Sequence, residues 1–346
     1  MTTHENDTTA VTAVPATMTA WRQLAYGGPD AVTATRLDVP RPGRGEVLLR
    51  VRATALNSGD IHVMRGEPRA VRLAFGLRRP RVAVRGMDVA GTVVSVGDEV
   101  TAFAVGDEVV GELPGGGLAE YVATPAAKLT ARPESVDPVT AAALPVAGGT
   151  AWLALEKAGI TPDSAPGRRV LVIGASGGVG TFTVALAALR GAEVWALAGA
   201  RSRTAVEGLG ATRVLDYREV QPGSDELPDG TFDAVIDIAG EPPLAALQRL
   251  VRDGGRIALV GGEGGSILGP MRRILGGALR SIGSTRRFVP VVATTTAALT
   301  GELIALAAAG DLAPLIERTW PLSQAGDAIA HVDAGHTLGK VVVVAG

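Results

Sequence analysis

The glycine-rich loop GASGGVG, at residues 174–180, has the residue types and the spacing to bind phosphate. An apolar, β-branched run precedes it at residues 170–173, which predicts a buried parallel strand. An apolar stretch of helical length follows at residues 181–189, and Gly191 stands where a left-handed helix cap belongs. Glycines let the backbone approach a pyrophosphate closely, and the free N–H groups at the helix start then face its oxygens.

A second strand is expected just after this helix, at residues 193–197. Strand, glycine loop, helix and strand together predict the first half of a βαβ dinucleotide site. The alternative is a glycine-rich turn between packed elements that binds no ligand. The loop residues predicted to bind the dinucleotide are Gly174, Ser176, Gly177, Gly178, Val179 and Gly180.

The residues after the second expected strand indicate which nicotinamide dinucleotide is bound. An NAD site usually has a carboxylate there for the ribose 2′-hydroxyl, and the segment Gly199-Ala200-Arg201-Ser202-Arg203 has none. Two arginines and a serine are instead the donors that a 2′-phosphate needs. The sequence therefore predicts NADPH, with Gly199, Arg201, Ser202 and Arg203 in the site. The alternative is that the arginines only solvate a helix start.

Several other chemistries lack their residues in this chain. The absence of cysteine removes disulfides, thiolate nucleophiles and cysteine-ligated zinc. The histidines show no spacing typical of a metal site, so we predict no metal; they are His4, His62, His331 and His336. The tyrosine and lysine pair of short-chain reductases is also missing, because no tyrosine is followed by lysine four residues later.

Composition and charge place the chain among ordinary globular proteins. It has 346 residues, 47% of them hydrophobic and 20% charged, with a formal net charge of −2. This balance favours neither nucleic acid nor an anionic membrane as a partner, and no apolar run has transmembrane length. Residues 1–17 are polar and lack the features of a signal peptide, so we predict a disordered tail and a cytoplasmic location.

The chain is long enough for two domains, and its texture changes twice. Short alternating strands and frequent glycines up to about residue 132 predict a small, bent barrel. Alanine-rich helices then alternate with apolar strands, which predicts a doubly wound parallel α/β sheet. This alternation ends near Asp311, and residues 339–344 form a strand that could close the first sheet. We therefore predict one discontinuous domain, residues 18–132 and 311–346, with a Rossmann domain inserted at 133–310.

From about Met18 onward, the chain resembles the zinc-independent medium-chain dehydrogenase/reductase superfamily, in its quinone oxidoreductase-like branch. The motifs that carry the resemblance occur in the family's order. They are WRQLAYGGPD at 21–30, NSGD at 57–60, GMDVAG at 86–91, ALPVAGGTAW at 143–152, the glycine loop, LGA at 209–211 and LDY at 215–217. The resemblance implies a chaperonin-10-like β-barrel domain, a Rossmann domain, and a nicotinamide cofactor in the cleft between them. It also implies that no zinc is bound, since Gly86-Met87-Asp88 replaces a glycine-histidine-glutamate of the zinc enzymes.

The resemblance further implies roles for individual residues. Asn57 would orient the ribose or a substrate oxygen, and Asp60 would either act in catalysis or cap a helix. Thr150 would bind the carboxamide, with hydrogen bonding to its own helix as the alternative. Tyr217 would approach the 2′-phosphate. The nicotinamide would also meet two loops, which contain Gly240 and the pair Val260 and Gly261.

No cluster of residues looks like a strong acid–base centre, which suits hydride addition to a quinone or to an α,β-unsaturated carbonyl. Nearby N–H or O–H donors would stabilise the resulting oxyanion, and a proton would follow from solvent or from a nearby acid. His62 is a candidate donor, with a surface role as the alternative. Two other functions stay open, namely a tailoring enoyl or enone reductase of a biosynthetic pathway and a non-catalytic NADPH-binding protein. The resemblance also implies a homodimer, formed by pairing of an edge strand across a two-fold axis, and residues 280–284 are the candidate strand.

Overall fold

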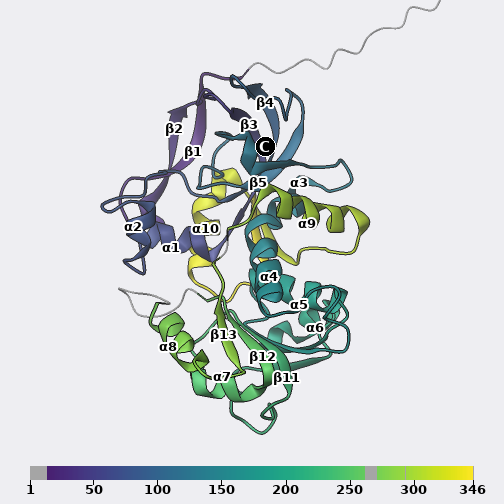
Figure 1. The fold of residues 1–346 in the computed structure, drawn as a ribbon. Coiled ribbons are helices and arrows are strands. Elements are labelled where there is room, and N and C mark those ends of the chain that lie inside the picture. The colour runs from purple at the N-terminus through teal and green to yellow at the C-terminus, as the bar shows by residue number, and fades with distance from the viewer. Residues whose placement is uncertain (1–13, 262–270, 293, 346) are drawn as a thin grey trace, which may run out of the picture.

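The computed structural model describes residues 14–261, 271–292 and 294–345. The two larger β-sheets lie at opposite ends of the molecule, with helix α4 (Pro145–Lys157) between them (Figure 1). Strands β1 (Thr17–Gln23) and β2 (Val32–Asp38) form a separate two-stranded sheet. The predicted tail falls outside the described residues up to residue 13. Its predicted end is wrong, because Thr17 already begins strand β1 and pairs with Asp38 of β2.

The first sheet has seven strands, in the order β14-β15-β3-β4-β5-β7, with β6 also paired to β3. Strand β15 follows almost the whole chain, yet it lies antiparallel beside β3, with Val341 opposite Leu56. The predicted closure of this sheet by the last strand is confirmed. The strands are β3 (Glu46–Leu56), β4 (Asp88–Val96), β5 (Glu108–Glu112), β6 (Tyr121–Pro125), β7 (Leu129–Ala131), β14 (Ile316–Pro321) and β15 (Lys340–Val344).

The helices on the first sheet are short. Helix α1 (Ser58–Arg65) leaves directly from the end of β3, and α10 (Ala325–Asp333) precedes β15. Another short helix of this half is α2 (Val71–Phe75). The described part of the chain also has four single 3₁₀ turns, of which three lie in this half and η3 lies in the half of the second sheet. They are η1 (Pro29–Ala31), η2 (Ala126–Lys128), η3 (Ala200–Ser202) and η4 (Leu322–Gln324).

The second sheet has six parallel strands in the order β10-β9-β8-β11-β12-β13. Counted along the chain, this is the 3-2-1-4-5-6 order of a Rossmann sheet. Successive strands are added toward one edge up to β10 and toward the other edge from β11, so the switch point lies between β8 and β11. The strands are β8 (Arg169–Ile173), β9 (Glu193–Ala198), β10 (Arg213–Asp216), β11 (Phe232–Asp237), β12 (Val251–Leu259) and β13 (Arg287–Pro290).

Local sequence explains where the helices of this half begin and end. Asp137 accepts hydrogen bonds from Val139 N and Thr140 N, at 2.9 and 3.0 Å, and so caps α3 (Pro138–Ala143). Gly191, just after α5 (Gly178–Leu189), has the left-handed φ of 86° that the sequence predicts. The other helices are α6 (Arg203–Gly208), α7 (Leu244–Leu250), α8 (Met271–Ser281) and α9 (Ala297–Ala309).

The predicted edge strand at residues 280–284 is wrong. Residues 280 and 281 end helix α8, and a turn follows. The strand at that edge of the sheet is β13, which starts three residues later and pairs in parallel with β12. Ser281, the last residue of α8, links the helix to the strand, because its Oγ accepts a hydrogen bond from Phe288 N of β13 at 2.9 Å.

One apolar core runs through the junction of the two halves. Buried alanines of α3 pack between side chains of β3, β4 and β15 on one side and the Rossmann helices on the other. Small side chains permit this close approach of helix and sheet. The two sheets are therefore held together by packed apolar surface as well as by the chain connections. In the part of the chain that the structure describes, no helix is both long and apolar enough to cross a membrane.

Candidate active site

A cavity of about 720 Å³ opens at the carboxyl ends of β8, β9 and β11, at the switch point where the strand order of the Rossmann sheet reverses. Ligands of open α/β sheets bind at this position, and the volume lies within the range of about 300–1,000 Å³ for cofactor sites. The Rossmann side supplies the glycine loop and the ends of the three strands. The half of the molecule that contains the first sheet supplies the opposite wall, from α1, from the end of α10 and from the segment after it. The residues are Ser58, His62, Val332, Gly335, His336 and Thr337.

The glycine loop has the shape that a pyrophosphate needs. Gly174 has a φ of +81°, and a Cβ atom there would lie 2.7 Å from Ala239 Cβ. A Cβ atom on Gly180 would lie 2.1 Å from Gly174 O, so neither position accepts a side chain. Gly177 stands at the N-terminal cap of α5 and, together with Ser176, Gly178 and Val179, faces the cavity. These residues fit a dinucleotide, because the glycines at 177, 178 and 180 leave the backbone N–H groups of the helix start open to the cavity.

The residues predicted to bind a 2′-phosphate are only partly brought together. Tyr217 lines the cavity, whereas Arg201, Ser202 and Arg203 are absent from the lining that the structure describes. Arg201 donates a hydrogen bond to the His336 carbonyl, across the cavity mouth. Arg203 donates to Val214 O at 2.6 Å, and Ser202 is buried, so both of these side chains are held within the Rossmann half.

Sequence reasoning did not single out Arg218, which contacts Tyr217 but is itself absent from the described lining of the cavity. Its guanidinium carbon lies 4.6 Å from the centre of the Tyr217 ring, a cation–π contact. A Cβ atom on Gly199 would lie 3.1 Å from Arg218 Nη1 and 3.6 Å from Tyr217 Cε1, so the pair sits directly over Gly199. The only signal in the sequence was the position of Arg218 next to a tyrosine already implicated.

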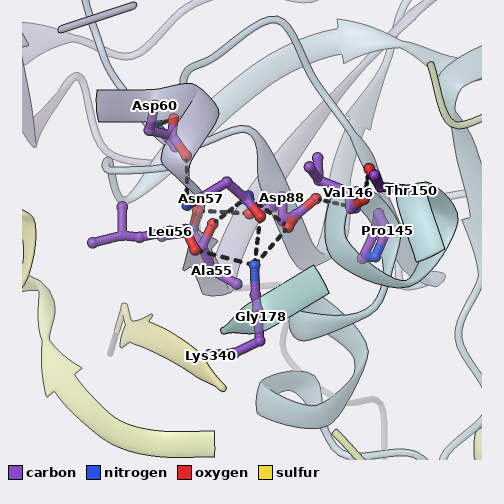
Figure 2. Close-up of polar contacts among 12 residues, drawn as sticks. Ala55, Leu56, Asn57, Asp60, Asp88, Pro145, Val146, Thr150, Gly178 and Lys340 are labelled. Carbon is purple, nitrogen blue, oxygen red and sulfur yellow. Dashed lines mark hydrogen bonds and ion pairs between the residues drawn. The ribbon is translucent and has the colours of Figure 1, made fainter. Parts of the chain in front are cut away.

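Asn57 lies in a buried polar network with Asp88 and Lys340 (Figure 2). Its amide nitrogen donates to Asp88 Oδ2 at 2.8 Å, and its amide oxygen accepts from Lys340 Nζ at 2.5 Å. The side chains of Asp88 and Lys340 are 0% and 2% exposed. Burial raises the pKa of Asp88 to about 7, against the opposing effects of Lys340 and Asn57. Burial likewise lowers the pKa of Lys340. Asn57 is therefore firmly oriented by these two charged partners.

Asp60 is placed as a cap. Its two carboxylate oxygens accept hydrogen bonds from Asn57 N at 3.1 Å and from Gly86 N at 2.9 Å. Burial raises the pKa of this carboxyl, and the two backbone donors oppose the rise. This geometry matches the capping alternative, since the carboxylate fixes the start of α1 against the loop before β4.

Thr150 lies one turn into α4, and its hydroxyl donates to Val146 O at 2.6 Å. This matches the alternative of hydrogen bonding within its own helix. Val146 N donates to Asp88 Oδ1 at 2.9 Å, so Thr150 is linked to the buried network through the first turn of α4 (Figure 2). The hydroxyl oxygen keeps acceptor capacity toward a ligand.

The two loops expected near the nicotinamide lie side by side. Gly240 lines the cavity and has a φ of +81°. Val260 N and Gly261 N both point to Asp237 O, at 2.9 and 3.3 Å, which ties the end of β12 to the end of β11. Gly262, the next residue of the expected loop, lies outside the described residues.

Among the described residues, no group of three or more histidine, aspartate or glutamate side chains could hold a metal ion. His331 Nε2 lies 3.1 Å from Glu317 Oε2, and His62 Nδ1 lies 3.0 Å from Glu67 O. His62 also lines the cavity, one turn after Ser58. His4 lies outside the described residues.

Comparison with known proteins identifies the family. A family model described as alcohol dehydrogenase GroES-like domain matches residues 43–134, and one described as zinc-binding dehydrogenase matches residues 209–343. A chloroplast envelope quinone oxidoreductase homolog of Arabidopsis thaliana is 34% identical over 333 residues, covering 94% of this chain and 98% of the relative. An NADPH-dependent alkenal/one oxidoreductase from the chloroplast of the same plant is 30% identical, covering 97% and 81%. The solved quinone oxidoreductase of Coxiella burnetii superposes with a TM-score of 0.81 at 25% identity, covering 95% and 99%.

A GroES-like domain joined to a Rossmann sheet, with a cavity at the switch point, defines a medium-chain dehydrogenase/reductase, and the chain belongs to that superfamily. Within it, the chain belongs to the quinone oxidoreductase-like branch. It is an oxidoreductase, and its relatives support a nicotinamide cofactor.

Proposed function

We propose that the protein reduces quinones or α,β-unsaturated carbonyls with NADPH and without zinc. The observation that carries this proposal is the cavity at the switch point, with a phosphate-shaped glycine loop on one wall and Ser58 and His62 on the other. The names of the relatives, which include quinone and alkenal/one oxidoreductases, support the substrate class.

The proposed chemistry divides the labour between cofactor and chain. When bound, the nicotinamide would supply a hydride. The chain would bind the cofactor, orient it toward the substrate and exclude water from the site. The N–H groups at the start of α5 hold the pyrophosphate, while the loops after β11 and β12 border the nicotinamide end. Donors on the cavity wall stabilise the oxyanion that forms as the hydride adds, among them the Ser58 hydroxyl. His62, whose Nδ1 lies 3.0 Å from the Glu67 carbonyl oxygen, is the proposed proton donor, through Nε2 of its imidazolium form.

The preference for NADPH is supported by the adenosine end of the cavity. Strand β9 ends in Ala198 without a carboxylate, and the Tyr217 and Arg218 pair stands over Gly199. The carboxylate of Asp216 accepts hydrogen bonds from Ala200 N at 3.2 Å and from Arg218 N at 3.0 Å, and its Oδ1 lies 3.7 Å from Arg218 Nη1, so Arg218 partly neutralises this carboxylate. An arginine N–H facing a phosphate is a charge-assisted donor, the strongest kind in proteins.

Independence from zinc is supported by the chemistry around Asp88. This residue takes the place of the glutamate in the glycine-histidine-glutamate motif of zinc enzymes, and here its charge is balanced by Lys340. Met87 stands in place of the histidine. A carboxylate paired with a buried ammonium does not need a metal ion to neutralise it.

We further propose a cytoplasmic homodimer in which β13 pairs with its copy in a second subunit. β13 ends the order of the Rossmann sheet, and an end strand offers backbone groups for pairing. Leu275 and Leu279 of helix α8 beside it are 59% and 69% exposed, and Ile282, the residue after the helix, is 77% exposed. Such a row of exposed apolar side chains is typical of a surface that a partner covers.

A turnover panel tests the proposed function. The purified protein is given NADPH or NADH with quinones, short alkenals, cyclic enones and enoyl thioesters, with and without a chelator, and cofactor consumption is followed. We expect NADPH-dependent turnover of at least one quinone or alkenal that the chelator leaves unchanged. Turnover confined to enoyl thioesters would favour the biosynthetic tailoring reductase, and cofactor binding without any turnover would favour the non-catalytic alternative.

A further inference from the structure

Lys340 is a buried lysine at the point where the two walls of the cavity meet. It is the first residue of β15, and its side chain is 2% exposed. The residue before it, Gly339, donates from its backbone N to Ser176 O of the glycine loop at 2.8 Å. Burial of an ammonium group is costly, so its position calls for partners that compensate the loss of water.

The aliphatic part of Lys340 packs on the glycine loop. A Cβ atom on Gly178, the first residue of α5, would lie 3.0 Å from Lys340 Cδ. Gly339 also forms a parallel bridge with Gly177. The start of β15 therefore lies directly behind the loop that faces the cavity, and the methylene chain of Lys340 supports it from below.

The ammonium group of Lys340 reaches the opposite wall. Its Nζ donates to Asn57 Oδ1 at 2.5 Å and to Leu56 O at 3.0 Å, and Asp88 Oδ2 lies 3.5 Å away (Figure 2). Ser58, which lines the cavity, directly follows Asn57 at the start of α1. One side chain thus touches the glycine loop with its stem and holds the start of α1 with its charge.

Asp88 extends this connection to a third element. One of its oxygens accepts from Asn57 Nδ2 and the other from Val146 N at the start of α4, which carries Thr150. A buried ion pair is weak evidence for stability, because apolar side chains of similar volume often stabilise a fold as well or better. A role in geometry explains better why a charged pair occupies this place.

We propose that Lys340 is a positioning residue that sets the spacing between the glycine loop and the start of α1, and thereby the width of the cofactor cavity. The proposal rests on the proposed function only in that the cavity holds a nicotinamide dinucleotide. It assigns Lys340 no contact with the reacting atoms. Its effect passes through Gly178 on one wall and through Asn57 on the other.

The test separates cavity geometry from stability with two variants, Lys340→Met and the double variant Lys340→Met/Asp88→Asn. The single variant leaves Asp88 buried without its cation, whereas the double variant removes both charges, so we expect the double variant to regain most of the lost melting temperature. We expect both to bind NADPH about tenfold more weakly, which is about 1.4 kcal/mol, measured as the Kd by fluorescence titration. In turnover assays, we expect the KM for NADPH to rise as the Kd rises, and kcat to change much less.

Controls identify each outcome. The pair Arg132 and Glu108, also partly buried but away from the cavity, supplies the matched variant Arg132→Met/Glu108→Gln, whose NADPH affinity should equal that of the wild type. The variant Lys340→Arg keeps the charge, and so the fold, should the neutral variants not fold. Its longer head group displaces Asn57, and we expect a Kd about threefold weaker than in the wild type.

A double variant that melts like the wild type and also binds NADPH like the wild type would overturn the proposal, since Lys340 would then serve stability alone. Wild-type affinity in Lys340→Arg, if that is the only variant that folds, would overturn it equally. A wild-type protein that binds neither NADPH nor NADH would instead contradict the proposed function, before any variant is compared.

Discussion

The Rossmann wall of the cavity is built from backbone, whereas the wall from the first sheet is held in place by buried charge. On the first wall, Gly174 and Gly180 leave no room for a Cβ atom, so close backbone packing determines the shape of the loop. On the second wall, Asn57 is fixed by Asp88 and Lys340, which come from strands far apart in the chain. The comparison teaches that the two walls should fail in different ways, the first by steric clash and the second by loss of charge balance.

The largest effect is expected from Asp88→Leu, which leaves the buried ammonium of Lys340 without its counter-charge. Breaking a buried ion pair from one side typically costs about 3–5 kcal/mol of unfolding free energy. Denaturant unfolding of the wild type and the variant measures it. The exposed pair of Arg44 and Glu99 supplies the control, because Arg44→Ala should change little there. Equal losses in the two variants would contradict the charge-held wall.

The pH dependence of stability provides a second test of the buried charges behind the wall from the first sheet. The pKa of Asp88 is raised to about 7 from 3.8, so between these values the folded protein binds more protons than the unfolded chain, and stability falls as pH rises. A shift of this size corresponds to at most about 4 kcal/mol. The lowered pKa of Lys340 acts in the opposite sense, with stability rising from its folded pKa up to 10.5.

The measurement is the difference in unfolding free energy between the wild type and Lys340→Met/Asp88→Asn across pH. The difference isolates the pair from the other titrating groups of the protein. We expect the wild type to lose unfolding free energy relative to the double variant as the pH rises from about 4 to about 7. A difference that does not change with pH in this window would contradict the raised pKa.

On the backbone wall, Gly180→Ala should destabilise the fold by about 2–3 kcal/mol, since the new methyl group meets a backbone oxygen that cannot move aside. Gly177→Ala is its matched partner, because the nearest atom to a Cβ there is 3.9 Å away. We expect Gly177→Ala to fold normally and to bind cofactor more weakly, as its methyl group enters the cavity. Thermal unfolding and NADPH titration of both variants separate the two effects, and equal melting temperatures would count against the steric argument.

The smallest effect is expected at the adenosine end, where exposed side chains belong to neither wall. Arg218→Ala should weaken NADPH about tenfold and leave NADH nearly unchanged, because only NADPH carries the phosphate that the guanidinium would meet. Arg201→Ala should show a similar but lesser loss, and Arg203→Ala none, since Arg203 is held by Val214 O. Titration of both cofactors against the three variants measures this. Equal affinities of the wild type for both cofactors would end the NADPH assignment.

What could be predicted from the sequence follows the same division. The glycine loop and its flanking strand and helix follow from local patterns, because neighbouring residues determine them. The strand at β15 is likewise visible as a local apolar run, whereas its pairing with β3 was inferred from the change of pattern along the chain. The network of Lys340, Asn57 and Asp88 joins residues up to 283 positions apart, and no local pattern records such a pairing. Its one trace in the sequence is a lysine placed directly before four valines of a buried strand.

Contacts between separate elements occur at two places where the sequence led to other predictions. The edge strand was predicted at residues 280–284, but a helix takes its first residues, and Ser281 anchors β13 further along. The role of Arg203 at a phosphate stays a prediction, and in the structure its side chain donates to the carbonyl oxygen of Val214. Both contacts join separate elements of the fold, and the sequence does not display them.

The late position of Lys340 in the chain has a consequence for how the protein is made. Asn57 is synthesised 283 residues before Lys340, a delay of roughly 15–55 s at ribosomal speeds of about 5–20 residues per second. The Rossmann strands leave the ribosome within that interval, while the first sheet still lacks β14 and β15. The second wall of the cavity can therefore be completed only after Lys340 has left the ribosome, and until then Asp88 has no ammonium partner.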